Sequence, residues 1–159
     1  MIMQYTLKGV YQTMEQKQWK VITEDDNISL HDCIISRIDF GNDIVLHFED
    51  GFNVTKDNAC NSTKRHKLTD ESAVVLHQAK DFKGVKYLKD DTAINLEKTE
   101  INKIDFEILD FSFDKETGQV KISGRAWDEE GDVFSELEAK ACRVTYCWNE
   151  LIEDAWFQF

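Results

Sequence analysis

The chain has 159 residues, the length of one domain, and is long enough to bury a core without a disulfide or a metal. Hydrophobic residues make up 42% of it and aromatic residues 11%, which excludes a disordered chain. Its net charge is −12; residues 81–159 carry 19 acidic and 10 basic residues, net −9, whereas residues 1–80 carry 12 and 9, net −3. Such acidity repels phosphate backbones and attracts basic proteins, so we expect a basic protein partner and no nucleic acid.

The chain contains no stretch that approaches the roughly 18 apolar residues of a membrane span, and its first residues lack the pattern of a secretion signal. We therefore expect a cytoplasmic protein that does not enter a membrane. Thiols stay reduced in that compartment, and the cysteines lack the close paired spacing of a zinc site. We predict reduced structural thiols, no metal and no cofactor. The cysteines are Cys33, Cys60, Cys142 and Cys147.

Strand patterns dominate the first half. Residues 34–40 and 43–48 are rich in β-branched and aromatic residues and flank Gly41-Asn42, a dipeptide suited to the positive φ angles of a tight hairpin turn. A second turn at residues 49–51 leads into another apolar run, so residues 30–54 are predicted to form three consecutive antiparallel strands. Residues 55–71 are polar and aperiodic, which predicts a long loop.

Strands resume after that loop. We predict them at residues 73–77, 85–88, 103–113, 119–127, 133–140 and 142–148. Glycine-containing turns at residues 115–118 and 129–132 connect three of them. The apolar alternation changes phase between Ile108 and Phe111, which predicts a β-bulge in that strand. The two helix candidates are short, near residues 13–21 and 148–154.

The pattern of residues 30–54 is similar to that of residues 103–135: each is a strand, a turn, a strand, an acidic glycine turn and a third strand. This similarity arises either from duplication or from the degeneracy of short β patterns. Both interpretations predict the same fold class. We expect a mainly β, single-domain protein in which antiparallel meanders form a β-sandwich or a partly open barrel, with one or two short helices.

Adjacent His31, Asp32 and Cys33 are residue types that catalytic sites use. In an extended strand, side chains 31 and 33 share one face and side chain 32 lies on the other. His31 and Cys33 are then able to meet, but Asp32 cannot orient that histidine without a distorted backbone. The simpler interpretation is that Asp32 turns the chain and Cys33 packs as a small hydrophobic residue.

Other residues that resemble site chemistry also have a structural explanation. Asp105 and Glu107 alternate with apolar residues, which is typical of the solvated face of a strand and not of a catalytic carboxylate pair. His47 is expected on the polar face of its strand. No phosphate-binding glycine motif or nucleophile elbow occurs in the sequence, and we predict no catalytic residue.

The segment LHDCIISRIDFGNDIVLHFEDGF, residues 30–52, carries a family resemblance. Its Leu-His-Asp triplet, followed by strand, turn and strand, resembles the opening of small uncharacterised bacterial proteins, including immunity proteins of polymorphic toxin systems. Some families of this kind are acidic and mostly β. The resemblance implies a binding protein and not an enzyme, so no catalytic residue is carried over from it.

Two functions follow from these observations. The first is a non-enzymatic acidic protein-binding module, most concretely an immunity protein that occludes a bacterial toxin domain. Its predicted partner-binding residues are Trp127, Asp128, Glu129, Glu130, Asp132, Glu136 and Glu138. The alternative is a small enzyme or ligand-binding β-protein with a pocket near His31, Cys33 and His47 and bordered by Trp127.

Overall fold

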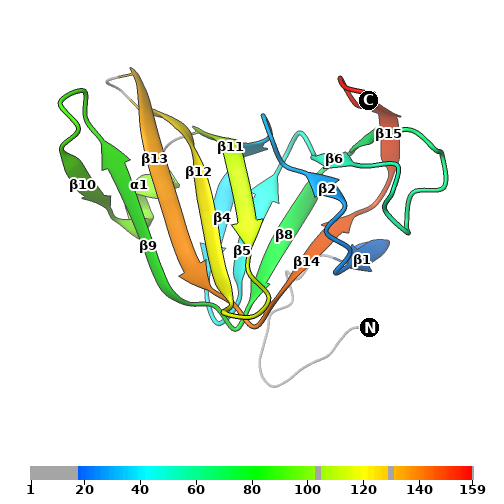
Figure 1. Cartoon of the computed structure of the whole chain (residues 1–159), viewed down its shortest axis with the longest axis horizontal. Coiled ribbons are helices and arrows are strands. Elements are labelled where there is room, and N and C mark those ends of the chain that lie inside the picture. The colour runs from blue at the N-terminus through cyan, green and yellow to red at the C-terminus, as the bar shows by residue number, and fades with distance from the viewer. Residues whose placement is uncertain (1–17, 103–104, 129–130, 159) are drawn as a thin grey trace.

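The computed structural model describes residues 18–102, 105–128 and 131–158, which are mostly antiparallel β-structure with one short helix (Figure 1). The strands in this part of the chain form three sheets, of which two pack as a sandwich. The predicted fold class is confirmed. No helix among the described residues is long and apolar enough to cross a lipid bilayer.

Two large sheets form the layers of the sandwich, and the strands β11 to β13 lie in front of β4, β5 and β8 in Figure 1. The five-stranded sheet has the order β1 (Val21–Thr23), β14 (Arg143–Trp148), β8 (Ser72–His77), β5 (Ile44–Phe48) and β4 (Arg37–Phe40). The six-stranded sheet has the order β10 (Ala93–Leu96), β9 (Lys80–Tyr87), β13 (Gly131–Lys140), β12 (Gln119–Asp128), β11 (Asp105–Phe113) and β3 (Ile34–Ile35).

A third, four-stranded sheet lies at the end of the sandwich near the C-terminus (Figure 1). Its order is β15 (Leu151–Asp154), β7 (Lys67–Thr69), β6 (Asn53–Val54) and β2 (Ile28–Ser29). The helix α1 (Lys98–Ile101) precedes β11, and the carboxylates of Glu97 and Glu100 each accept a backbone N–H of the other residue in a capping box.

The core lies between the two large sheets and follows from strand alternation. In β5, Ile44, Leu46 and Phe48 are buried and alternate with partly exposed Val45 and His47. They belong to the same apolar cluster as the buried residues of β11 and β12. Burying each large apolar side chain stabilises the fold by about 1.5–3 kcal/mol.

The C-terminal meander β11–β12–β13 confirms the strands predicted there. The predicted β-bulge is also confirmed, because the register of β11 against β12 shifts between Ile108 and Asp110. Gly124 lies opposite this bulge, and a Cβ added there would approach the carbonyl oxygen of Glu107 to 2.1 Å. The bulge therefore requires a residue without a side chain on the neighbouring strand.

In residues 30–54 the predicted hairpin is confirmed as β4 and β5, but the prediction that three consecutive strands pair in one meander is wrong. β3 pairs with β11 and β4 with β5, and β6 pairs with β2 and β7 in the third sheet. Ser36 separates β3 from β4, and its hydroxyl binds the carbonyl of His47 and the N–H of Glu49 (3.0 and 3.1 Å). These bonds hold the chain where it passes from one layer to the other.

The predicted turn at Gly41-Asn42 is present, but its conformation is different. Phe40 pairs with Ile44, so the loop has three residues, and neither Gly41 nor Asn42 has a positive φ. The second predicted turn has the expected left-handed glycine, since Gly51 has φ 81°. A Cβ on Gly51 would lie 2.3 Å from the carbonyl oxygen of Thr69.

The predicted helix at residues 148–154 is wrong. β14 continues to Trp148, and Leu151–Asp154 form β15, because the Asp70 carboxylate accepts the N–H groups of Asn149 and Glu150 and turns the chain between the two strands. The other predicted helix, residues 13–21, lies mostly outside the described residues, and its last residue begins β1. The sequence did not predict α1, β1, β2, β7, β10 or β15, and residues 55–71 contain β7 besides the expected loop.

The two segments with similar sequence patterns have different topologies. The strands described within residues 105–135 are adjacent in one sheet. The strands within residues 30–54 are distributed over all three sheets.

Candidate functional site

His31, Asp32 and Cys33 form a turn that enters β3. Asp32 has φ 65°, and its N–H donates to the carbonyl of Ile108 (2.8 Å). Nδ1 of His31 lies 2.8 Å from the carbonyl oxygen of Leu109, and its Nε2 lies 3.4 Å from the Asp32 carboxylate. The backbone distortion that an Asp32–His31 contact requires is therefore present, but the histidine ring binds β11 and not the thiol.

The Cys33 thiol is packed in the core. Its Sγ lies 3.7 Å from the carbonyl of Ser29, and burial raises the pKa of the thiol to about 12. A high pKa opposes thiolate formation, which a nucleophilic cysteine needs. This geometry supports the interpretation in which Asp32 turns the chain and Cys33 packs as a small hydrophobic residue.

His47 lies apart from these residues, on the polar face of β5 as predicted. Its Nε2 lies 2.8 Å from the Asp39 carboxylate and 3.1 Å from the Arg37 guanidinium. Burial acts to raise the pKa of Asp39, but the bonds from His47 and Arg37 outweigh it and lower that pKa. The side chains of His31, Cys33 and His47 therefore have separate partners, and within the described ranges no three His, Cys, Asp or Glu side chains gather as metal ligands would.

The outer face of the six-stranded sheet carries exposed aromatic residues among acids. Trp127 on β12 is 37% exposed and Phe134 on β13 is 44% exposed, because both alternate with buried neighbours along paired strands. We call this region the Trp127 face. It comprises Tyr87, Asp105, Glu107, Arg125, Trp127, Asp132, Phe134 and Glu136.

Contacts within the Trp127 face hold its side chains in place. The Arg125 guanidinium lies 3.1 Å from Glu107 and 3.4 Å from Asp132, and 5.6 Å from the centre of the Trp127 ring. The rings of Tyr87 and Phe134 have centroids 5.9 Å apart. The Tyr87 hydroxyl donates to Glu136 (2.7 Å), which raises the pKa of the tyrosine.

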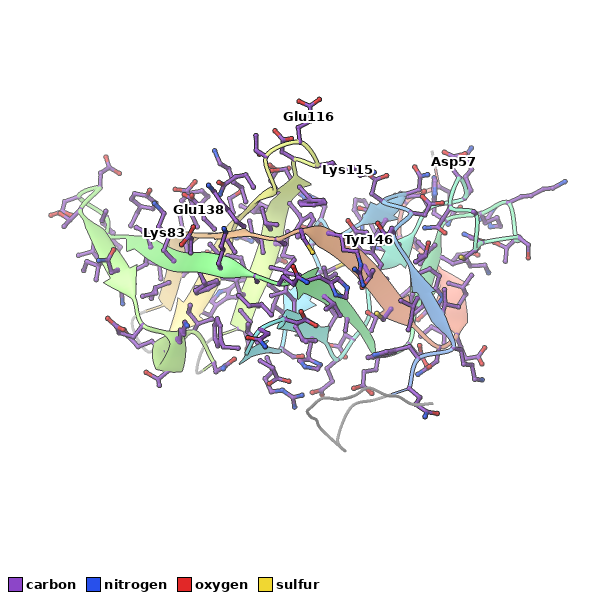
Figure 2. The ribbon with its side chains drawn as sticks, turned by 90° about the horizontal axis from the view of Figure 1, so that it is seen from below. Asp57, Lys83, Lys115, Glu116, Glu138 and Tyr146 are labelled. Carbon is purple, nitrogen blue, oxygen red and sulfur yellow. The ribbon has the colours of Figure 1, made fainter. Side chains whose placement is uncertain are left out.

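The structure brings together some of the predicted partner-binding residues and separates others. Trp127, Asp132 and Glu136 share the Trp127 face. Glu138 lies farther along β13, 4.0 Å from Lys83 (Figure 2). It is also opposite Lys121, so the face is more basic there. Asp128 ends β12, and Glu129 and Glu130 lie outside the described residues.

Sequence reasoning missed Tyr87 and Phe134 as members of this face. Phe134 was detectable, because it is two residues from Glu136 in a predicted strand and such residues share a face. Tyr87 was not, because its position depends on the pairing of β9 with β13, which joins distant parts of the sequence.

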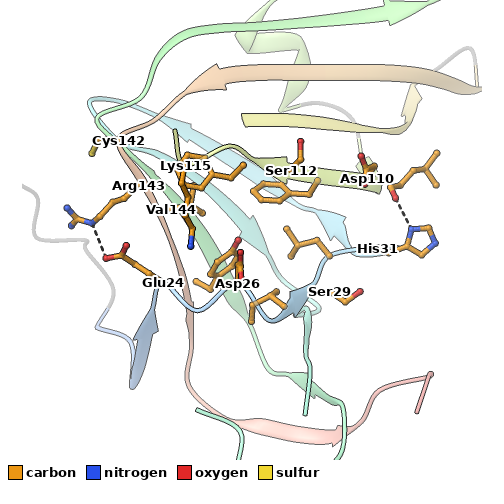
Figure 3. A pocket seen from close by; sticks show the side chains of 16 residues that line it. Glu24, Asp26, Ser29, His31, Asp110, Ser112, Lys115, Cys142, Arg143 and Val144 are labelled. Atoms are coloured by element: carbon orange, nitrogen blue, oxygen red, sulfur yellow. Dashed lines mark hydrogen bonds and ion pairs between the residues drawn. The ribbon is translucent and has the colours of Figure 1, made fainter. Parts of the chain in front are cut away.

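A pocket of about 620 Å³ opens between the layers beside β11 (Figure 3). Its walls come from the segment of residues 24–31, from the second half of β11 and from β14. The lining residues are Glu24, Asp26, Ile28, Ser29, Leu30, His31, Leu109, Asp110, Phe111, Ser112, Phe113, Lys115, Cys142, Arg143, Val144 and Tyr146. The volume is in the range of small-molecule sites.

The pocket has an apolar floor and a charged rim. Leu30, Val144 and Tyr146 are buried, and burial followed by the nearby Asp26 carboxylate raises the pKa of the tyrosine. At the rim, the Arg143 guanidinium lies 4.0 Å from Glu24 (Figure 3). Of the three side chains in the alternative prediction, His31 lines this pocket and Cys33 and His47 do not.

Comparisons with protein-family models, curated proteins and solved structures found no match for the chain. The resemblance of residues 30–52 to immunity proteins therefore stays a prediction.

Proposed function

We propose that this chain is a non-enzymatic protein-binding module that binds a basic folded protein through the Trp127 face. The observation that carries the proposal is the exposure of Trp127 and Phe134 side by side with Asp132 and Glu136 on two paired strands. Following the sequence resemblance, the most concrete form is a cytoplasmic immunity protein that occludes a toxin domain.

The aromatic residues suit the centre of an interface. Trp and Tyr are enriched among the residues whose truncation costs most of the binding energy, because they bury a large area with few rotatable bonds. Trp127 is also positioned by Arg125, and Phe134 by Tyr87. A side chain that is ordered before binding loses less conformational entropy when the partner arrives.

The charges suit a basic partner. In the Trp127 face, Arg125 opposes Asp105, Glu107, Asp132 and Glu136, so the excess is acidic. The net charge of −12 has the same sign. Complementary charge increases the rate of association, and the buried aromatic contacts lengthen the lifetime of the complex.

The test starts with the genes adjacent to the one that encodes this chain and with any basic protein that they encode. Binding of that protein is measured by stopped-flow mixing at several salt concentrations. Asp132→Asn with Glu136→Gln should lower the association rate about two- to tenfold and flatten its salt dependence. Trp127→Ala should instead raise the dissociation rate, by about 30-fold for a central aromatic residue.

A matched control replaces two exposed acids elsewhere, Glu49→Gln with Asp50→Asn, in the turn after β5. This pair should leave association nearly unchanged. An equal decrease of the association rate in both double variants would show that only the net charge matters. Unchanged kinetics in Trp127→Ala would reject the Trp127 face as the interface. For an immunity protein, coexpression should also restore growth of cells that produce the partner.

A further inference from the structure

The edge of the six-stranded sheet is open along the second half of β11. The neighbouring strand β3 is short and pairs with Phe106 and Glu107. Beyond them the turn before β3 provides the last contacts: the N–H of Asp32 donates to Ile108, and the His31 ring binds the carbonyl of Leu109. Phe111 and Phe113 lie past this point.

Hydrogen-bond alternation places the peptide groups of Phe111 and Phe113 at that edge. The N–H of Asp114 donates to Gln119 on the β12 side (2.9 Å). In an antiparallel pair every second residue forms backbone hydrogen bonds to the same neighbouring strand, so Asp110 and Ser112 also bond β12. The backbone N–H and C=O groups of Phe111 and Phe113 therefore point away from β12, toward the open edge. Among the described residues, no hydrogen bond from outside the sheet reaches the N–H or C=O of either phenylalanine.

This open edge forms one wall of the 620 Å³ pocket, which Leu109 to Phe113 line (Figure 3). The opposite wall contains β2, itself the edge strand of the four-stranded sheet. The pocket therefore has the form of a slot between two strand edges. Exposed strand edges with unpaired peptide groups are the template on which extended peptides add.

We propose that the slot binds an extended segment of a partner protein, which pairs antiparallel with Phe111 and Phe113 and continues the line of β3. The inference goes beyond the Trp127 face, because the ligand is an extended chain and not a folded surface. It commits to a segment in which apolar and basic residues alternate.

The apolar half of that pattern follows from the floor of the slot. Phe111 and Phe113 pack against the core, so peptide residues directly opposite them point inward as well. There they meet buried Leu30, Val144 and the Tyr146 ring. Small β-branched side chains suit this position, since they favour strands and need little depth.

The basic half follows from the rim. Asp26 and Asp110 are exposed, and no ion pair to either is formed within the described residues, whereas Arg143 already faces Glu24. Lys115 is the second cation of the rim, so the acids are in excess there. A second copy of this chain is a poor occupant, because each copy carries a charge of −12.

The first experiment is amide hydrogen exchange of the free protein, read by NMR. The amides of Phe111 and Phe113 should exchange fast, and those of Asp110 and Ser112, which bond β12, should be protected. The probe is an acetylated and amidated heptapeptide of alternating Lys and Val. At saturation it should slow exchange at Phe111 and Phe113 on the order of tenfold or more.

Two N-methylated versions of the probe separate strand addition from charge attraction. The inward-facing valines are the residues that bond Phe111 and Phe113, so N-methylation of the valines should abolish binding. N-methylation of the lysines should preserve it, because their peptide groups point away from β11. Asp26→Asn with Asp110→Asn should weaken binding several-fold. Control substitutions at exposed Asp57 and Glu116 (Figure 2) should not.

Equal binding of the two N-methylated probes, or binding without protection of Phe111 and Phe113, would overturn the proposal. So would the absence of binding by the unmodified probe, or protection of these amides by self-association in the absence of peptide. Trp127→Ala should leave peptide affinity unchanged, so this proposal and the proposed function can fail independently.

Discussion

Cysteine reactivity is the most direct test of the residues that first suggest catalysis. Burial raises the pKa of both Cys33 and Cys147 from 9.0 to about 12, which lowers the thiolate fraction near neutral pH on the order of a thousandfold. Cys60 and Cys142 are exposed. With iodoacetamide under native conditions, mass spectrometry should show fast labelling of the exposed pair, and of the buried pair only after denaturation. Fast labelling of native Cys33 that depends on His31 would restore the catalytic interpretation.

Gly124 should be irreplaceable because of its contact across the bulge. In Gly124→Ala the added Cβ would lie 2.1 Å from the Glu107 carbonyl and 2.6 Å from the Phe106 ring. Relieving that overlap should lower the free energy of unfolding by about 1–3 kcal/mol or more, measured by urea denaturation. Gly41→Ala is the matched control, since its Cβ would lie 3.5 Å from the nearest carbonyl. A neutral Gly124→Ala would contradict the described register.

His77 should make stability depend on pH. Burial, followed by Arg143, lowers the pKa of His77 from 6.5, although Asp43 opposes the shift. The unfolded chain therefore binds a proton at a higher pH than the folded protein does, and stability present above pH 6.5 is lost as the pH falls through the folded pKa.

The measurement compares urea denaturation at about pH 7.5 and about pH 5.5. His77→Gln, which retains a polar group near the Thr145 hydroxyl, should lose less stability over this interval than the native chain. An identical loss in both proteins would assign the pH dependence to other groups.

At the scale of elements, the edge strand β4 depends on one side chain. The amide of Asn102 accepts the N–H of Ile38 (2.8 Å) and donates to its carbonyl (2.9 Å), as a neighbouring strand would. Asn102→Ala should lower stability by about 1–2 kcal/mol and speed amide exchange at Ile38. Asn95→Ala, on the exposed strand β10, is the control and should have little effect.

Sequence patterns predicted the elements whose partners are close in the chain. β11, β12 and β13 follow one another, each turn is short, and the shift between Ile108 and Phe111 locates the bulge. The third sheet could not be predicted, because β2, β6, β7 and β15 are short and pair across long stretches of sequence. In β15, strand structure depends on the Asp70 carboxylate, which lies far from it in the sequence.

In the candidate site, too, the parts built from neighbouring strands could be predicted and those built from distant strands could not. Trp127, Asp132 and Glu136 share a face because two consecutive strands form a hairpin whose register follows from its turn. The open edge at Phe111 and Phe113 exists because the pairing of β3 with β11 extends only to Ile34 and Glu107. No local sequence pattern around residue 34 specifies how far this pairing extends. Pairing between distant strands therefore limits what the sequence alone predicts.

At the scale of the whole molecule, the charge should make stability depend on salt. A net charge of −12 repels itself more strongly in the folded state than in the expanded chain. Raising NaCl from about 10 mM to about 300 mM shortens the screening length from roughly 30 Å to less than 10 Å. The midpoint of urea unfolding should therefore rise.

A variant with fewer exposed acids, Glu49→Gln, Asp50→Asn, Asp57→Asn and Glu153→Gln, should respond less to the same change. A midpoint that falls with salt in the native chain would show that the exposed ion pairs outweigh the repulsion.

The pairing of β1 with β14 has a consequence for synthesis on the ribosome. β14 lies between β1 and β8, so the five-stranded sheet cannot be assembled until residues near the other end of the described chain have emerged. Until then β8, which carries the apolar side chains of Val74 and Leu76, is able to pair with β5 but lacks its second neighbour, β14. A nascent chain that lacks β14 therefore leaves one edge of the five-stranded sheet unpaired at β8. That open edge is expected to need protection from aggregation until β14 pairs with it.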